Sequence, residues 1–190
     1  GFMSYNNSQK EIETKTYKAL NMYASIADDS LEDYFKEREG DGKVFATTSD
    51  VYQSMNILKS SGWDTNSMKW QRQVNNLDNL APVLVKEYGY SFAFLTDPEG
   101  KVVYSTNEDV TGADLSERDY IQGALKGNMS WSELFYSDVI DANCLVLSLP
   151  IRSGGKIGGV IGSANLLMDQ AGINSIVHDG LTKLGESADA

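Results

Sequence analysis

The fold is decided by a stretch that begins Tyr90-Ser-Phe-Ala-Phe-Leu-Thr-Asp97, continues Pro98-Glu-Gly100 and ends Lys101-Val-Val-Tyr-Ser-Thr106. The segment Asp97-Pro-Glu-Gly100 has the residue types of a type I turn, because proline suits the second position and glycine the fourth. The residues on either side alternate in the manner of strands and not of helices. The sequence therefore predicts a β-hairpin formed by Tyr90–Thr96 and Lys101–Thr106.

Downstream of this hairpin the sequence predicts one short helix and three more strands. Ser116 can cap the start of the helix, and Gly127 can close its end. The strands are expected near Trp131–Ser137, Asn143–Arg152 and Lys156–Asn165, with turns at Asp141-Ala-Asn143 and Ser153-Gly-Gly155. Because these connections have the length of hairpin loops, we expect an antiparallel sheet.

Upstream of the hairpin, a long helix is expected from about Gln9 to Glu39. Ser8-Gln-Lys-Glu11 has the spacing of a capping box, and apolar residues then recur every three to four positions until Gly40-Asp-Gly42 ends the pattern. Two interpretations stay open for this helix. It can pack along its own domain, or it can be a stalk that descends from a membrane span and pairs in a dimer, and the two can hold together.

Three further helices complete the expected set. The second helix of the chain is predicted at Ser49–Leu58. The third carries apolar residues on one face, at Trp70, Val74, Leu77, Ala81, Leu84 and Tyr88. Pro82 should kink or divide this helix, and Gly89 should cap it. The last helix carries Ile173, Ile176, Val177, Leu181 and Leu184.

The composition restricts the possible partners. Twenty-seven acidic and sixteen basic residues give the 190-residue chain a formal net charge of -11. Such a charge repels phosphate backbones and anionic headgroups, so nucleic acid is not expected as a partner. The longest apolar runs, such as Cys144–Leu149, are far shorter than the ~20 residues that cross a bilayer.

Residues that could form a catalytic or metal site are scarce. His178 is the only histidine and Cys144 the only cysteine, so neither a familiar zinc cluster nor an intrachain disulfide can be built. We expect His178 on the polar side of the last helix and Cys144 buried in a strand. In Ser153-Gly-Gly-Lys-Ile-Gly-Gly159, Ile157 stands where the magnesium ligand of a phosphate loop must be Ser or Thr. The sequence predicts no enzyme, no metal and no cofactor.

A binding residue is easier to find than a catalytic one. A ligand pocket in such a sheet needs a concave face covered by loops and a helix, and the segment after the hairpin can cover it. Arg118 lies on that segment, and its planar guanidinium can hold a carboxylate by two parallel hydrogen bonds. The alternative is a surface pair between Arg118 and Glu117 or Asp119, which contributes little.

The order of these motifs, with Gly112-Ala-Asp-Leu-Ser-Glu-Arg-Asp-Tyr120 between the hairpin and the helix, resembles the Cache-type extracytoplasmic sensor domains of prokaryotic chemoreceptors and related transmembrane receptors. The resemblance is to the membrane-distal, PAS-like module of double Cache domains of type 1. It implies an α+β fold with a five-stranded antiparallel sheet, a long N-terminal helix and additional flanking helices. One folded unit is expected, with a helical region at 1–89, the sensor module at 90–168 and an exit helix at 169–190.

The resemblance also implies site residues. In the amino-acid-binding branch, an arginine and the aromatic residues after it grip the ligand carboxylate, and Arg118 and Tyr120 stand at the arginine and first aromatic positions. A Tyr-x-Asp motif on the next strand, matched by Tyr136 and Asp138, holds the ammonium group. Asn165 stands where the family has a further aspartate, so it keeps an acceptor but lacks the charge that offsets a buried cation.

Other residues are expected around the same pocket. Phe94 and Trp131 are candidate apolar walls, although core packing also accounts for Phe94. Tyr104 and Ser148 can add hydrogen bonds. An α-amino acid, another carboxylate, an amine and a nucleobase-like compound all stay open as ligands.

Two classes of function follow from the resemblance. The first is a sensory module of a membrane receptor, a chemotaxis receptor in the first place and otherwise a histidine kinase or a cyclic-dinucleotide enzyme. The second is a structural module that dimerises through the N-terminal helix and has a vestigial pocket. Either module contacts the membrane only through flanking segments, and a second Cache module or a membrane span is expected after Ala190.

Overall fold

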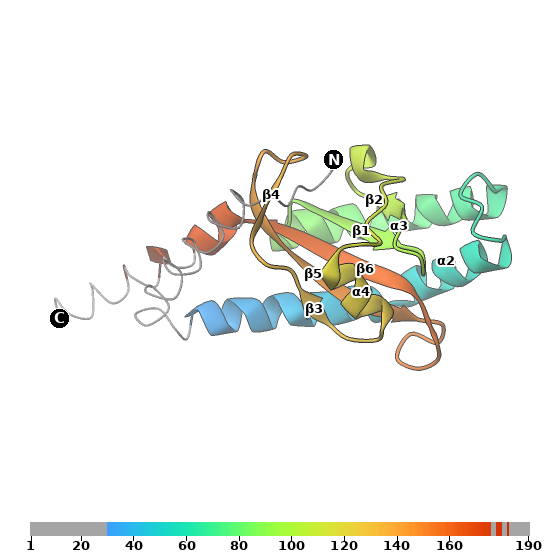
Figure 1. The fold of residues 1–190 in the computed structure, drawn as a ribbon, viewed down its shortest axis with the longest axis horizontal. Coiled ribbons are helices and arrows are strands. Elements are labelled where there is room, and N and C mark those ends of the chain that lie inside the picture. The colour runs from blue at the N-terminus through green and yellow to red at the C-terminus, as the bar shows by residue number, and fades with distance from the viewer. Residues whose placement is uncertain (1–29, 176–177, 180–181, 183–190) are drawn as a thin grey trace.

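The computed structural model describes residues 30–175, 178–179 and 182, and shows an antiparallel sheet with helices on both faces (Figure 1). In chain order the labelled elements are α2 (Ser49–Ser60), α3 (Met68–Tyr88), β1 (Phe92–Thr96), β2 (Val102–Ser105), η1 (Glu108–Val110), α4 (Asp119–Leu125), β3 (Ser130–Trp131), β4 (Phe135–Ser137), β5 (Ala142–Arg152) and β6 (Val160–Asp169). Helical residues 30–47 precede α2, and helical residues 170–175 follow β6. The α+β class is the one expected from the sequence.

The sheet has the strand order β2-β1-β6-β5-β3, with β4 also paired to β5. All strand pairs are antiparallel, as predicted. Strands β3 and β4 pair with different parts of β5 on the same side, so together they form one edge of the sheet. The six strands therefore make a sheet that is five strands wide. This arrangement places the longest strands, β5 and β6, near its middle.

One strand was expected at Trp131–Ser137, and that expectation is wrong because the segment divides into β3 and β4. Trp131 packs with the cluster on one face of the sheet, whereas Phe135 belongs to the cluster on the other. A continuous strand would place both on the same face, since side chains alternate. Ser132 bridges the break, because its N–H donates to Val146 O at 2.8 Å and its Oγ accepts from Val146 N at 2.8 Å.

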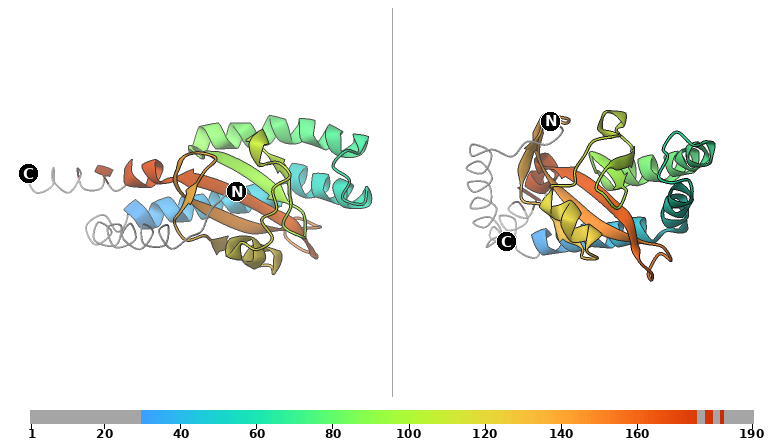
Figure 2. Two further views of the ribbon diagram at one scale, coloured as in Figure 1. Left: turned by 45° about the horizontal axis from the view of Figure 1, so that its top comes forward. Right: turned by 45° about the vertical axis from the view of Figure 1, so that its right-hand side comes forward.

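Residues 30–47, α2 and α3 cover one face of the sheet, which we call the helical face (Figure 2). The prediction that Gly40-Asp-Gly42 ends the first helix is wrong, because helical structure continues to residue 47. A Cβ at Gly42 would lie 2.5 Å from Leu149 Cδ1. The glycine therefore allows the helix to lie close against β5. The predicted start near Gln9 and its capping box lie outside the described residues.

Helix α3 is continuous from Met68 to Tyr88 and contains Pro82, so the proline does not divide it. Ser67 caps its start by accepting a hydrogen bond from Trp70 N, and Gly89 ends it with a φ of 76°, as predicted. Helix α2 extends two residues beyond its predicted end.

Helix α4 covers the opposite face, which we call the α4 face (Figure 2). The prediction that Ser116 caps this helix is wrong, because Arg118 is its N-cap residue. The backbone before it is tied instead to the hairpin turn, where Leu115 N donates to Gly100 O at 2.9 Å. A Cβ at Gly100 would lie 2.7 Å from Ser116 Cα, so only glycine allows this approach.

The last strand begins later than predicted. Residues 153–159 form a loop and not the start of a strand at Lys156. Gly155 and Gly158 have φ values of 81° and 94°, and Arg152 Nη1 donates to Gly158 O at 3.0 Å. Strand β6 then continues past Asn165 to Asp169.

The last helix starts after β6, with Ile173 buried in the helical-face cluster. Its start and the start of helical residues 30–47 lie toward the same end of the molecule (Figure 1). His178 is exposed and Cys144 is buried, as expected. None of the helices in the described ranges combines the length and apolar character of a membrane span.

Candidate ligand-binding site

A cavity of about 340 Å³ lies between the N-terminus of α4 and the segment that follows β3, and we call it the Arg118 cavity. It is lined by Glu117, Arg118, Asp119, Tyr120, Trp131, Ser132 and Glu133. Three residues that were proposed from the sequence, Arg118, Tyr120 and Trp131, therefore meet at one cavity. They come from two segments of the chain that the sheet brings together.

Arg118 stands at the rim of this cavity and is half-buried. Its backbone is extended, with φ -77° and ψ 128°, and its N–H donates to Leu115 O at 3.0 Å. The N-cap position fixes the direction in which the backbone enters α4, and so fixes the Cα from which the guanidinium extends. An arginine at a cavity rim can present two parallel donors to a carboxylate.

Tyr120 and Trp131 are held by contacts on opposite faces of the sheet. Tyr120 is 2% exposed and stacks on Phe135, with ring centroids 6.2 Å apart. Trp131 Nε1 donates to Glu39 Oε1 at 3.0 Å, and its ring meets Phe35 edge-on at 5.2 Å. A wall of the cavity is thus joined directly to helical residues 30–47.

A row of polar side chains is buried on the α4 face. Thr96 Oγ1 and Ser163 Oγ lie 2.6 Å apart, and Asn165 Nδ2 donates to Ser163 Oγ at 3.0 Å and to Phe94 O at 3.2 Å. Ser148 is paired in register with Asn165 across β5 and β6, which places their side chains on the same face. We call these four side chains, Thr96, Ser163, Asn165 and Ser148, the polar row.

Two atoms of the polar row lack hydrogen-bond partners in the described part of the chain. They are Asn165 Oδ1 and Ser148 Oγ, and both residues are 0% exposed. A buried polar atom without a partner costs about 1–3 kcal/mol. A bound water or a ligand can supply the missing partners of such atoms.

Tyr120 and Phe94 lie on the same face of the sheet as this row. Both belong to the apolar cluster of the α4 face, and Tyr120 also lines the Arg118 cavity. Phe94 is paired in register with Asn165 across β1 and β6. The aromatic rings therefore lie on the face that carries the two unsatisfied polar atoms.

Tyr136 and Asp138 lie at the hairpin between β4 and β5, away from the lining of the Arg118 cavity. Tyr136 Oη donates to Asp141 Oδ1, and this hydrogen bond raises the pKa of the phenol. Asp138 is exposed in the turn. Ser137, the neighbour between them, is buried, and its Oγ has no partner within the described residues.

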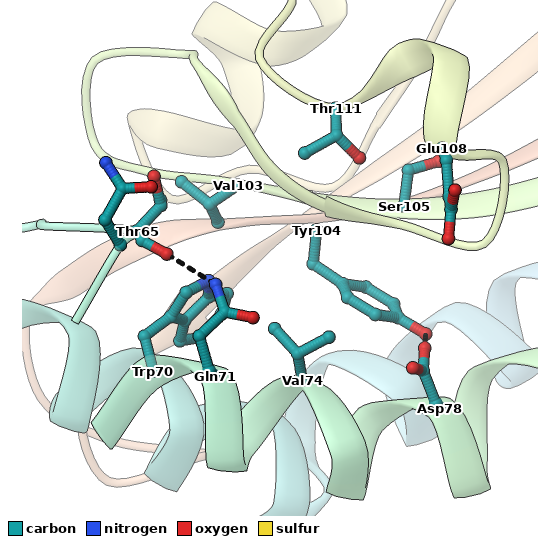
Figure 3. Close-up of a pocket in the computed structure, with 11 residues that line it drawn as sticks. Thr65, Trp70, Gln71, Val74, Asp78, Val103, Tyr104, Ser105, Glu108 and Thr111 are labelled. Atoms are coloured by element: carbon teal, nitrogen blue, oxygen red, sulfur yellow. Dashed lines mark hydrogen bonds between the residues drawn. The ribbon is translucent and has the colours of Figure 1, made fainter. Parts of the chain in front are cut away.

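Tyr104 lies at the other edge of the sheet. Its Oη donates to Asp78 Oδ1 at 2.9 Å, and it lines a second cavity beside α3 (Figure 3). The structure thus separates Tyr104 from the group at the Arg118 cavity.

Sequence reasoning missed Thr96 and Ser163 as members of the polar row. The available signal was the spacing of Ser163 and Asn165 two residues apart in an apolar strand, since such residues point to one face. Thr96 became part of the row only through the register of β1 with β6, in which it pairs with Ser163.

No protein-family model matches the chain, and no curated protein sequence matches it. Solved structures do match. The sensor domain of the V. cholerae histidine kinase DctB superimposes with a TM-score of 0.62 at 12% identity, covering 90% of this chain and 59% of that one. The sensory domain of the Campylobacter jejuni chemoreceptor Tlp3 with isoleucine bound gives 0.61 at 15% identity, covering 92% and 68%.

The E. coli DcuS sensor domain gives a TM-score of 0.60 at 13% identity, covering 78% of this chain and 98% of that one. The chain has the fold of these sensor domains, which is the fold that its resemblance to Cache domains implied. It spans 59% of the length of the DctB domain and 98% of the DcuS domain.

Proposed function

We propose that this chain is the extracytoplasmic sensing domain of a membrane signal-transduction receptor, a methyl-accepting chemotaxis protein in the first place, and that it binds a small carboxylate or amino-acid-like ligand. The fold is shared with sensor domains of a histidine kinase and a chemoreceptor. One observation carries the assignment of the binding face: Asn165 Oδ1 and Ser148 Oγ are fully buried there without partners.

The residues of this face define the chemistry of the ligand. Arg118 is the only basic residue among the described residues that line the Arg118 cavity, which also holds three carboxylates, and its guanidinium can pair with the carboxylate of a ligand. Asn165 Oδ1 accepts hydrogen bonds but carries no charge, which favours an N–H or O–H donor at the other end of the ligand. An α-amino acid or a hydroxylated organic acid combines these groups.

The contact between Trp131 and Glu39 supports a route for the signal. Trp131 lines the cavity, and Glu39 lies on helical residues 30–47, whose start lies at the same end of the molecule as the last helix. If Trp131 has two positions, a ligand with higher affinity for one of them raises the population of that position. Helical residues 30–47 then move with Trp131 through the hydrogen bond to Glu39. This route does not require the ligand to touch the helix.

The test is a thermal-shift screen with amino acids and organic acids, followed by calorimetric titration of the best compound. Binding to the native state alone raises the melting temperature, by an amount that grows with ligand concentration. Arg118→Ala should abolish the shift, and Arg72→Ala, which removes an exposed charge of α3, serves as the control. A panel without any stabilising compound would contradict the proposal and favour a structural module.

A further inference from the structure

A second cavity of about 370 Å³ lies at the sheet edge formed by β2, and we call it the β2-edge cavity (Figure 3). Strands β2 and β3 are the two outermost strands, so this cavity and the Arg118 cavity lie at opposite edges. Its lining comes from the loop before α3, from α3 itself, from β2 and from the segment around η1. The function proposed above makes no use of it.

The floor of the β2-edge cavity is apolar and well packed. Trp70, Val103 and Tyr104 are 1%, 3% and 3% exposed, and Val74 is packed against the same cluster. Figure 3 shows Val74 and the Tyr104 ring between Trp70 and Asp78. The loop at the other end is held to α3, because Gln71 Nε2 donates to Thr65 O at 2.8 Å. A small apolar body can therefore rest on a preformed surface.

Two carboxylates stand at one end of this floor. Figure 3 shows Glu108 facing the hydrogen-bonded pair of Tyr104 and Asp78. Burial, and then the bond to Asp78, raise the pKa of the Tyr104 phenol well above its usual value, so the phenol stays a neutral donor. The Tyr104 phenol donates to Oδ1 of Asp78 and leaves Oδ2 available to a ligand. Within the described residues, Glu108 makes no side-chain hydrogen bond or ion pair.

The charge balance of the β2-edge cavity favours a cation. Its eleven lining residues include Asp78 and Glu108 but no lysine or arginine. The chain as a whole carries a net charge of -11, which adds to the negative potential. A hard divalent cation would need more oxygen ligands than two carboxylates supply, and the described residues contain no group of three metal-ligating side chains.

We propose that the β2-edge cavity binds a small organic cation, namely a primary amine with a short apolar body. The ammonium group donates hydrogen bonds to Asp78 and Glu108, and the apolar body packs on Trp70, Val74 and Tyr104. The volume lies at the lower end of the range of ligand pockets, roughly 300–1,000 Å³, so the ligand is small. The cavity is lined by residues of two helical segments and a strand, which a bound amine would hold together.

The experiment is calorimetric titration of the whole chain with n-butylamine and with butyrate, which has the same carbon chain and the opposite charge. Butylamine should bind and butyrate should not. Asp78→Asn keeps an oxygen that accepts from Tyr104, and Glu108→Gln removes only a charge, so both variants should fold. Each should weaken butylamine binding about 5- to 20-fold.

Further measurements separate the proposal from its alternatives. Glu87→Gln, an exposed charge of α3 outside the cavity, should leave the affinity within about twofold. Arg118→Ala should also leave butylamine binding intact. Loss of butylamine binding in this variant would assign the amine to the Arg118 cavity and overturn the proposal. Absence of butylamine binding, or equal binding by Asp78→Asn, Glu108→Gln and Glu87→Gln, would overturn it too. So would competition by sub-millimolar Ca²⁺, which would indicate a metal site.

Discussion

The two faces of the sheet differ in how completely their buried groups are satisfied. The helical face carries the larger apolar cluster, and where polar groups are buried there they are paired, as Tyr90 is with Asp41 and Tyr104 with Asp78. The α4 face carries a smaller apolar cluster and the polar row, in which two atoms lack partners. Under the function proposed above, the helical face supplies most of the stability and the α4 face binds the ligand at some cost to stability.

The pairing on the helical face extends to its charged residues. Arg38 Nε donates to Asp41 Oδ2 at 3.1 Å, and its guanidinium lies 4.9 Å from the Tyr34 ring centroid and 5.5 Å from that of Tyr90. A cation over aromatic rings contributes about 0.5–2 kcal/mol. This group ties helical residues 30–47 to the start of the sheet.

The strongest test of the comparison is Leu77→Ala on the helical face. Leu77 is 0% exposed, and its truncation leaves a cavity in the larger cluster. We expect the free energy of unfolding to fall by about 2–5 kcal/mol, measured by urea denaturation. A loss below about 1 kcal/mol would contradict the view that the helical face contributes most of the stability.

The next test concerns binding and not stability. Arg118→Ala should lower ligand affinity by about 2–4 kcal/mol, or tens to hundreds of fold, because a charge-assisted pair of hydrogen bonds is lost. Arg118→Lys should recover only part of it, since a point charge cannot reproduce the planar fork. Calorimetry measures both variants. Unchanged affinity in Arg118→Ala would show that Arg118 does not bind the ligand.

Ser148→Ala sharpens the comparison, because it should act in opposite directions on stability and on binding. Removing an unsatisfied buried hydroxyl should raise the free energy of unfolding by about 1–2 kcal/mol. The same substitution should lower the affinity for the ligand. Thermal and urea unfolding of the ligand-free protein give the first quantity, and titration gives the second. Ser163→Ala is the matched control, because its Oγ has partners and its loss should destabilise.

The smallest expected effect is that of Glu39→Gln. It keeps an acceptor for Trp131 Nε1 but removes the charge, so the hydrogen bond should weaken by about 0.5–1 kcal/mol. We expect little change in ligand affinity and a reduced movement of helical residues 30–47 on binding, measured by the distance between two spin labels. An unchanged distance response would exclude this contact as the route.

The sequence predicted the elements whose determinants are local. The hairpin turn at Asp97–Gly100 formed as expected, because Asp97 Oδ1 accepts from Glu99 N and Lys101 N within five residues. Gly42 was misinterpreted, because its role depends on Leu149, more than a hundred residues away. The break between β3 and β4 likewise follows from which face each neighbour covers.

The candidate site was predicted only in part. Arg118, Tyr120 and Trp131 line one cavity. Tyr136, Asp138 and Asn165, which were expected around the same pocket, are not among its lining residues. The pairing of Tyr104 with Asp78 joins a strand to a helix across 26 positions, and no sequence pattern marks it. Register and packing, which are long-range properties, decided these outcomes.

The close approach at Gly42 is a point about which helical residues 30–47 could pivot on β5. With a rise of ~1.5 Å per residue, Glu39 lies roughly 4.5 Å from this point and residue 30 roughly 18 Å from it. If Gly42 acts as the fulcrum, a displacement of ~1 Å at Glu39 becomes one of ~4 Å at residue 30. Replacing Gly42 by a larger residue would shift this contact away from β5 and would change the ratio between the two displacements.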